Sequence, residues 1–311
     1  MRRGIWGLLL AACLLPFSVA AQTTDEFNQG LQTLWEALWH QSGTPTRIVK
    51  WEDSELRVRF TGVNVAQHHD HEMEALRAVT AEAHLNVRDV TGTPEEQSAN
   101  VTVQILPDNA LEDNQPCVTF LDFKTETKID SATVQMRDRD AWRCAYHESM
   151  HVMGVRGHPA GQTVLSYFPW KIDGLLPLDR VMLRAWYNPR MQGGMTPFEA
   201  LPILGDELLA TVSPAEKQAD MKARDQFYVD TIREMHAYAN GTGDVPAVVK
   251  RSGKSTPEGI RFGRSEMSYF LGIAYLEGAT VSRDATEAVK WLERASAMGN
   301  RGAQAKLGAF R

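Results

Sequence analysis

Three residues near the middle of the chain have the types and the spacing of a metal-dependent hydrolytic site. His147 and His151 are four positions apart, and Glu148 directly follows the first of them. Residues four apart on a helix share one face, so these two imidazole rings can bind one zinc ion. The carboxylate of Glu148 can then serve as the base for a water molecule on that ion. The segment therefore predicts a helical zinc site with hydrolytic chemistry.

A catalytic zinc ion takes three protein ligands and keeps its fourth position for water or substrate, so a third ligand is required. His158 follows the pair after a short segment that contains Gly154 and Gly157. Gly154 is well placed to end the helix in a left-handed turn. We expect His158 to be the third ligand. The carboxylates that remain as alternatives are Asp173, Asp179, Glu199 and Glu207.

The composition is that of a globular protein and argues against nucleic-acid binding. The chain has 311 residues, of which 43% are hydrophobic and 23% charged, and its formal net charge is −6. This length predicts about two domains. A mildly acidic chain without a long basic run is a poor candidate for binding nucleic acid.

The N-terminus has the three parts of a secretory signal. Residues 1–3 include two arginines, residues 4–17 form a short apolar core, and residues 18–21 offer small side chains for cleavage. We expect residues 1–21 to be removed on export and the mature protein to be periplasmic or secreted. Cys13 lies in a segment that resembles a bacterial lipoprotein box, so lipid anchoring there is the alternative. No segment is long and apolar enough to span a membrane.

Removal of that signal leaves two cysteines, Cys117 and Cys144. In an exported chain this number suggests one disulfide, with two buried thiols as the alternative. The bond would close a loop of about 28 residues and contribute about 3–4 kcal/mol. It would also tie the histidine helix to the preceding sheet, because Cys144 lies three residues before His147.

The order of the predicted elements indicates an α+β domain over residues 22–195. Alternating apolar residues predict four strands, and amphipathic segments predict helices before, between and after them. Helices that stand apart from a small mixed sheet are typical of the α+β class. Asp138 or Asp140 is expected to cap the histidine helix. The expected strands are residues 55–60, 101–105, 118–123 and 132–136, and the other expected helices are residues 31–39, 71–86 and 179–187.

The rest of the chain is predicted to be helical. Residues 196–255 form a helical connector and linker, in which a capping box at residues 213–216 opens a long helix and a segment rich in Gly, Ser, Thr and Pro follows. Residues 256–311 contain an internal repeat, because Leu271-Gly272 recurs 36 residues later as Leu307-Gly308. A period of this length is typical of paired helices in a solenoid.

A second histidine cluster, formed by His68, His69 and His71 with Asp70, could also bind a metal. It falls between a predicted strand and a predicted helix, where polar side chains satisfy free backbone amides. We therefore expect these residues to begin a helix rather than to hold an ion.

From His147 onward the chain resembles the metzincin metallopeptidases. Their signature is HExxHxxGxxH, followed by a tight turn with methionine and by a helix that ends in tyrosine. Residues 163–168 look like that turn, and residues 177–187 look like that helix. The resemblance implies a zincin-like fold and a zinc-dependent peptidase. It also implies that Tyr167 lies near the zinc and stabilises the oxyanion.

Two positions depart from the metzincin pattern. The third ligand of that family would fall on Gly157, whereas the histidine here is one residue later, at His158. Leu165 replaces the turn methionine, which packs beneath the metal in that family without binding it. Leucine is a similar apolar residue, so this exchange should cost little.

Two further resemblances concern other stretches of the chain. Residues 117–195 look like an uncharacterised bacterial family of exported zincin-like proteins. Residues 271–300 resemble Sel-one-like repeats, which are relatives of the tetratricopeptide repeat. Such repeats imply a protein-binding surface.

Together these features predict an exported zinc-dependent endopeptidase. His147, His151 and His158 would hold the Zn²⁺ ion, and Glu148 and Tyr167 would act on a peptide or protein substrate. The edge of the sheet can bind an extended substrate by backbone pairing. The alternative is a non-catalytic cell-envelope adaptor that binds a partner protein through its helical repeat, with zinc structural or absent.

Overall fold

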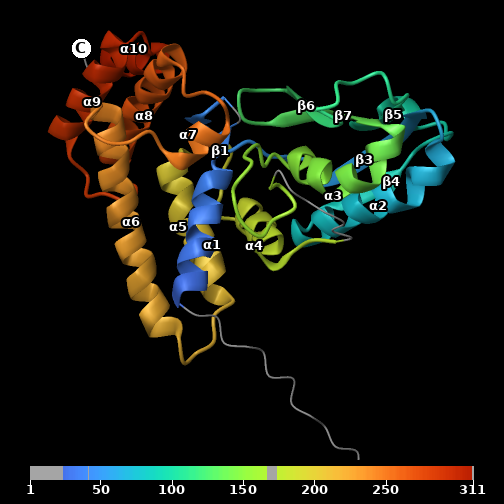
Figure 1. Cartoon of the computed structure of the whole chain (residues 1–311), viewed down its shortest axis with the longest axis horizontal. Helices are drawn as coiled ribbons and strands as arrows, with labels where there is room; N and C mark the ends of the chain where they lie inside the picture. The colour runs from blue at the N-terminus through green and yellow to red at the C-terminus, as the bar shows by residue number, and fades with distance from the viewer. Residues whose placement is uncertain (1–23, 41, 167–173, 310–311) are drawn as a thin grey trace, which may run out of the picture.

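The computed structural model describes residues 24–40, 42–166 and 174–309, and it shows a mixed α+β protein (Figure 1). A five-stranded sheet with its helices lies on one side, and a helical bundle with the C-terminal helices lies on the other. The predicted α+β class is confirmed. Cys13, the rest of the predicted signal and Tyr167 lie outside the described residues. No helix within the described ranges is both long and apolar enough to cross a membrane.

The sheet has the strand order β4-β3-β5-β7-β6, and all neighbours are parallel except the edge strand β6. Its strands are β3 (Glu55–Gly62), β4 (Asn86–Asp89), β5 (Val101–Leu106), β6 (Cys117–Phe123) and β7 (Ile129–Arg137). β3 follows the alternation in its sequence, because Leu56, Val58 and Phe60 are buried and their neighbours are more exposed. The four predicted strands are present. β4 lacks such a signal, because it is short and none of its side chains is fully buried.

Helices α2 (Val65–Glu82) and α3 (Ala141–Val152) pack against each other beneath the sheet (Figure 1). α3 carries His147 and His151 and follows the last strand, β7, after a single turn of 3₁₀ helix. This is the predicted place of the histidine helix. Gly154 ends the helix region in a left-handed conformation, with φ of 90°, as expected.

Asp140 occupies the N-cap position of α3, as predicted, but its side chain binds other side chains instead of a helix amide. The Asp140 carboxylate makes no capping bond and accepts from Arg137 and Arg143 at 2.7 and 2.8 Å. Asp138 accepts from His68 and from Asn64, each at 2.7 Å. Donors on neighbouring side chains therefore take the place of the backbone amides of the helix.

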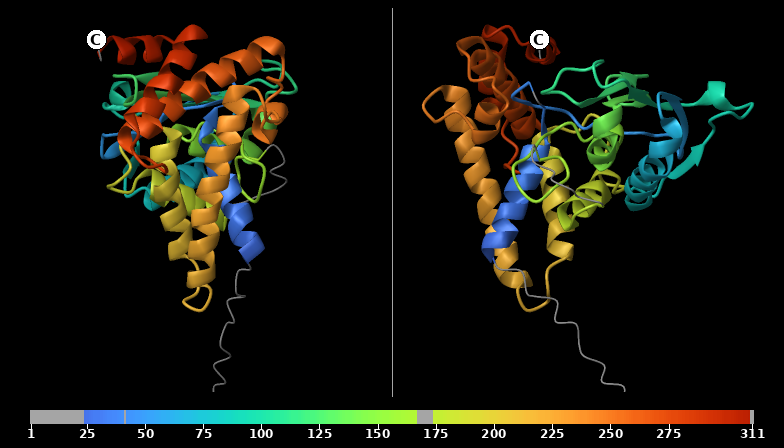
Figure 2. Two further views of the ribbon diagram at one scale, coloured as in Figure 1. Left: turned by 90° about the vertical axis from the view of Figure 1, so that its left-hand side faces the viewer. Right: turned by 45° about the vertical axis from the view of Figure 1, so that its right-hand side comes forward.

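A bundle of helices lies beside the sheet. Its members are α1 (Thr24–Ala37), α4 (Pro177–Trp186), α5 (Pro197–Ala210) and α6 (Lys217–Asn240), with a small hairpin of β1 (Trp39–His40) and β2 (Thr44–Pro45) after α1. α1, α5 and α6 run alongside one another (Figure 2). α5 was not predicted, because it is buried around most of its circumference and contains Pro202, so it has no amphipathic pattern.

The C-terminal helices form the predicted pair and continue the bundle. They are α7 (Ala247–Arg251), α8 (Pro257–Glu277), α9 (Ala285–Ala297) and α10 (Arg301–Gly308). α8 and α9 lie so close that a Cβ at Gly272 would be 2.8 Å from the Leu292 side chain. α8 also packs against α6 (Figure 2). α7 falls within the predicted linker and buries Val249, so the linker prediction is wrong for these residues.

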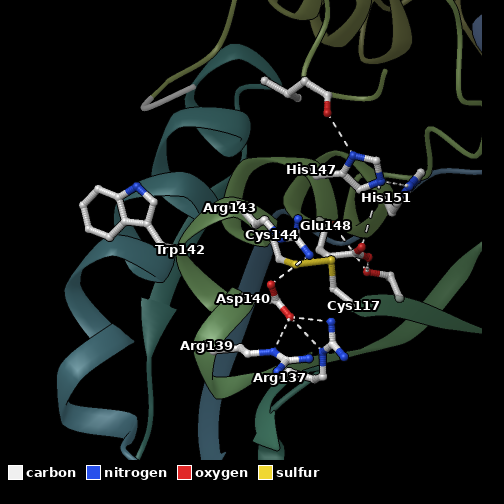
Figure 3. Close-up of a disulfide and its surroundings, with 12 residues drawn as sticks. Cys117, Arg137, Arg139, Asp140, Trp142, Arg143, Cys144, His147, Glu148 and His151 are labelled. Atoms are coloured by element: carbon white, nitrogen blue, oxygen red, sulfur yellow. Dashed lines mark hydrogen bonds and ion pairs between the residues drawn. A yellow bond between two sulfur atoms is a disulfide. The ribbon is translucent and has the colours of Figure 1, made fainter. Parts of the chain in front are cut away.

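One disulfide joins the edge strand to the histidine helix (Figure 3). Cys117 of β6 and Cys144 of α3 have their Cα atoms 6.2 Å apart. The predicted bond is confirmed. It holds β6 against α3 just before His147.

Replacement of both cysteines, Cys117→Ser with Cys144→Ser, should lower the free energy of unfolding by about 3 kcal/mol, because the open loop gains entropy in the unfolded chain. Urea unfolding followed by circular dichroism measures the difference. Dithiothreitol should cause the same loss in the wild-type protein and none in the double variant. A loss below about 1 kcal/mol would contradict a stabilising role for the bond.

The His69 ring on α2 lies between two carboxylates, Asp70 at 2.9 Å and Asp89 at 2.8 Å. These hydrogen bonds raise the pKa of His69. The resulting stability is fully present below the pKa of the unfolded chain, about 6.5, and is lost as the pH rises through the higher folded pKa. His69→Gln should therefore cost about 0.5 kcal/mol near pH 5 and much less near pH 9. Thermal unfolding at both pH values tests this, and an equal cost at both would contradict it.

Candidate metal centre

Three histidine side chains converge at the end of α3. Nε2 of His151 lies 3.1 Å from Nε2 of His147 and 3.2 Å from Nε2 of His158. The first two residues are on α3, and His158 is on the loop that follows it. In the part of the chain that the structure describes, these residues form the one group of histidine, cysteine or carboxylate ligands close enough to share a metal ion. The structure thus brings the three predicted ligands together.

Hydrogen bonds fix the protons of two of these rings. Nδ1 of His147 donates to the carbonyl of Val164 at 2.9 Å, and Nδ1 of His151 donates to the carbonyl of Val155 at 2.6 Å. A carbonyl oxygen can only accept, so each neutral ring carries its proton on Nδ1 and its lone pair on Nε2. The two Nε2 atoms therefore face each other with no proton between them. A cation would relieve this contact.

Burial favours the neutral form of two of these rings. It lowers the pKa of His151 well below its usual value, and the charges of His158 and His147 lower it further. Burial likewise lowers the pKa of His158 to about 3, with added effects of His147 and His40. Neutral imidazole is the form that binds a metal ion. His151 and His158 therefore offer lone pairs, rather than positive charge, at neutral pH.

The spacing of the nitrogen atoms suits a tetrahedral metal ion. Zinc binds histidine nitrogen at about 2.0–2.1 Å, so two such ligands at the tetrahedral angle lie about 3.4 Å apart. The two Nε2 separations that involve His151, 3.1 and 3.2 Å, are close to this value, and all three ligand atoms lie within 4.8 Å of one another. Carbonyl partners for Nδ1, as found here for two rings, are also typical of histidines that ligate metals.

Glu148 lies beside the histidines and is buried (Figure 3). Its Oε2 accepts a hydrogen bond from the Thr119 hydroxyl at 2.6 Å, and its Oε1 lies 4.0 Å from Nε2 of His147. Burial raises the pKa of Glu148, while the nearby His147 and the hydrogen bond from Thr119 act in the opposite direction. A carboxylate with a raised pKa is suited to general-base catalysis near neutral pH.

Thr119 belongs to no sequence motif, but the disulfide points to it. Cys117 and Thr119 are two apart and share one face of β6, and Cys144 and Glu148 are four apart and share one face of α3. Because the disulfide joins the first member of each pair, the second members lie nearby, and they form a hydrogen bond. The two predicted cysteines therefore contained the signal for the partner of Glu148.

Asp179 supports the turn behind His147 and lies outside the histidine group. Its carboxylate accepts from the hydroxyl of Thr163 and from the backbone amides of Val164 and Leu176, at 3.2 and 2.9 Å. Val164 then presents the carbonyl that accepts from His147. Asp179 thus supports the position of His147 through the backbone of this turn.

The other carboxylates considered as third ligands have different partners. Glu199 accepts from the backbone amide of Thr196 at 2.7 Å, at the start of α5. Glu207 accepts from the side chain of Asn188, also at 2.7 Å. Asp173 lies outside the described residues.

The last turn of α1 holds the loop that carries His158. The Thr33 hydroxyl donates to the carbonyl of Ala160 at 3.1 Å, and the Glu36 carboxylate accepts from the amide of Ala160 at 2.8 Å. On the other side of His158, the backbone at Gly157 packs against the end of α1. His158 therefore lies between two contacts with the same helix.

The histidines line a cleft of about 870 Å³ beside β6. His40 of β1 also lines this cleft, although no sequence pattern singles it out. Its Nδ1 accepts from the backbone amide of Ser42 at 3.1 Å, so neutral His40 carries its proton on Nε2. Burial lowers the pKa of His40 to about 4, with a further effect of Arg156. Only the fold brings His40 to the site.

The second histidine cluster forms no metal group within the described residues. α2 begins before it, so His68, His69 and His71 lie inside the helix and the prediction that they begin it is wrong. His68 binds Asp138 at 2.7 Å, and Nε2 of His71 donates to the carbonyl of Trp142 at 3.1 Å. These two rings hold α2 to the residues around the start of α3.

The comparisons with known proteins concern the C-terminal helices. No curated protein matches the chain. The family model of the Sel1 repeat matches residues 265–300, which include most of α8 and all of α9. The predicted Sel-one-like repeat is therefore confirmed, and this stretch of the chain is a Sel1 repeat.

Proposed function

We propose that this protein is an exported zinc-dependent endopeptidase with a zincin-like domain related to the metzincins. The observation that carries the proposal is the convergence of three histidine nitrogens beside a buried carboxylate in an open cleft. Structural zinc sites are closed by a fourth protein ligand, whereas catalytic sites keep one position open. The described residues supply three ligands to this group and no fourth.

His147, His151 and His158 would hold the ion through their Nε2 atoms. When bound, zinc supplies a Lewis acid that polarises a peptide carbonyl and lowers the pKa of water. The carbonyls of Val164 and Val155 keep the first two rings in the required tautomer and orientation.

Glu148 is the proposed general base. It takes a proton from the attacking water and gives it to the amine that leaves when the peptide bond breaks. Thr119 holds Oε2, so Oε1 is the oxygen on the side of His147. Tyr167 is proposed, on the metzincin resemblance, as a donor to the oxyanion, and His40 offers a further N–H donor in the same cleft.

The place of β6 supports a peptide or protein substrate. β6 is the last strand of the sheet, and among the described residues it pairs only with β7. An extended peptide can add to such an edge through backbone hydrogen bonds. The disulfide supports a periplasmic or secreted location, because such bonds persist outside the reducing cytosol.

The Sel1 repeat favours a second candidate function, that of an adaptor. Solenoids of paired helices present extended surfaces for protein partners. In this alternative the repeat binds a protein of the cell envelope, zinc is structural or absent, and no peptide bond is cleaved. Peptide hydrolysis by the zinc-loaded protein distinguishes the two functions, because only the peptidase would show it.

The purified protein should bind one zinc ion per chain, and His158→Ala should weaken this binding by more than about 100-fold, because even groups that only orient metal ligands contribute 10–100-fold. Elemental analysis and chelator competition measure the stoichiometry and the affinity. The exposed His84 provides a matched control, since His84→Ala should bind zinc like the wild-type protein. Unchanged affinity in His158→Ala would refute the assignment of the third ligand.

Glu148→Gln should keep zinc and lose at least about 100-fold in kcat/KM, because glutamine has the same shape but cannot accept the proton. Mass spectrometry of a digested peptide library identifies a substrate, on which rates are then measured. Glu74→Gln, on the exposed side of α2, is the control and should retain full activity. Equal turnover by Glu148→Gln would exclude its role as base. A zinc-loaded wild-type protein that cleaves no peptide would favour the adaptor.

A further inference from the structure

A buried carboxylate links the C-terminal segment to the metal centre. Glu36, in the last turn of α1, is only 3% exposed. Its Oε2 accepts from the backbone amide of Ala160 at 2.8 Å and also from the guanidinium of Arg251. Its Oε1 accepts from the side chain of Gln32 at 3.1 Å. One oxygen atom is thus shared by Arg251 and by a residue two positions after His158.

The loop is held against α1 on both sides of His158. Thr33 binds the carbonyl of Ala160, so both backbone groups of that residue are bound by α1. A Cβ at Gly161 would lie 2.3 Å from the Thr33 hydroxyl oxygen, and a Cβ at Gly157 would lie 2.4 Å from the Ala37 carbonyl oxygen. The loop has no room to slide along α1, so the direction of His158 depends on this contact.

The buried carboxylate of Glu36 requires a cation as its partner, and Arg251 is that cation. It is the one ion-pair partner of Glu36 among the described residues. Glu234 of α6 lies close enough for the charge of Glu36, after burial, to raise its pKa, so the surroundings add negative rather than positive charge. A buried charge that loses its partner is strongly unfavourable. Without Arg251, the Glu36 carboxylate would turn toward water and release the amide of Ala160.

Arg251 belongs to the segment that leads into the Sel1 repeat. It is the last residue of α7, and α8 begins at Pro257. We propose that Arg251 is a positioning residue for the third histidine, because it fixes the Glu36 carboxylate, which in turn fixes the backbone of Ala160 and the direction of His158. The segment that precedes the repeat thereby sets the metal affinity of the centre. This inference rests on the zinc site proposed above.

Arg251→Ala should weaken zinc binding by about tenfold or more, since groups that orient metal ligands typically contribute 10–100-fold in affinity. Arg251→Lys keeps the positive charge but lacks the planar guanidinium group. Its zinc affinity should lie between those of Arg251→Ala and the wild-type protein. Glu36→Gln keeps an oxygen acceptor for Ala160 but has no charge that needs a cation. Removal of Arg251 in the Glu36→Gln background should therefore have little further effect.

The test is the zinc dissociation constant of each full-length variant, measured by competition with a chromophoric chelator. Arg233→Ala is the matched control, because it removes an exposed arginine that pairs with Asp230 on α6. It should leave the constant within about twofold of the wild-type value. The double variant also distinguishes positioning from general destabilisation. General destabilisation would lower the zinc affinity equally when Arg251 is removed from the wild-type protein and from Glu36→Gln.

Three results would overturn the inference. Zinc affinities of Arg251→Ala and Arg251→Lys within about twofold of the wild-type value would overturn it and leave the zinc site intact. Additive losses in the double variant would overturn it as well, because Arg251 would then act independently of Glu36. A wild-type protein that binds no zinc would overturn the site and the inference together. If Arg251→Ala does not fold, Arg251→Lys in the wild-type and Glu36→Gln backgrounds decides by the same criteria.

Discussion

The contact between the last turn of α1 and the loop after α3 is the constraint on which the convergence of the three histidines depends. The geometry of one helix is enough to place His147 and His151 together. No local rule places His158 beside them. The loop that carries His158 is fixed by Thr33 and Glu36, which lie more than a hundred residues earlier in the chain. α1 packs in turn against α5 and α6. The helical bundle is therefore part of the scaffold of the centre.

Burial determines the electrostatics of this region. It lowers the pKa of His151 and His158, and it raises the pKa of Glu148. The buried Glu72 of α2 has its pKa raised well above the usual value, first by burial and then by the charge of Glu148. All of these shifts favour the neutral form of each group. A divalent cation would therefore be the dominant local charge in the cleft.

The features that could be predicted from the sequence are those governed by local rules. The alternation in β3, the helix that carries His147 and His151, and the Sel1 repeat of residues 265–300 each depend on neighbours along the chain, and all three are confirmed. His40 reaches the cleft through long-range packing, which no local pattern encodes, and Thr119 could be inferred only by way of the disulfide. α5 is missing from the predictions because a helix buried on most sides has no amphipathic period. Zinc binding by the three histidines stays a prediction.

Gly157 gives a physical reason for the departure from the metzincin spacing. In that pattern a histidine would occupy this position. Here the backbone lies against the end of α1, and a Cβ atom would come within 2.4 Å of the Ala37 carbonyl oxygen. A histidine side chain therefore fits only at the next residue, position 158. The packing of α1 against this loop therefore decides which position of the loop can carry the third histidine.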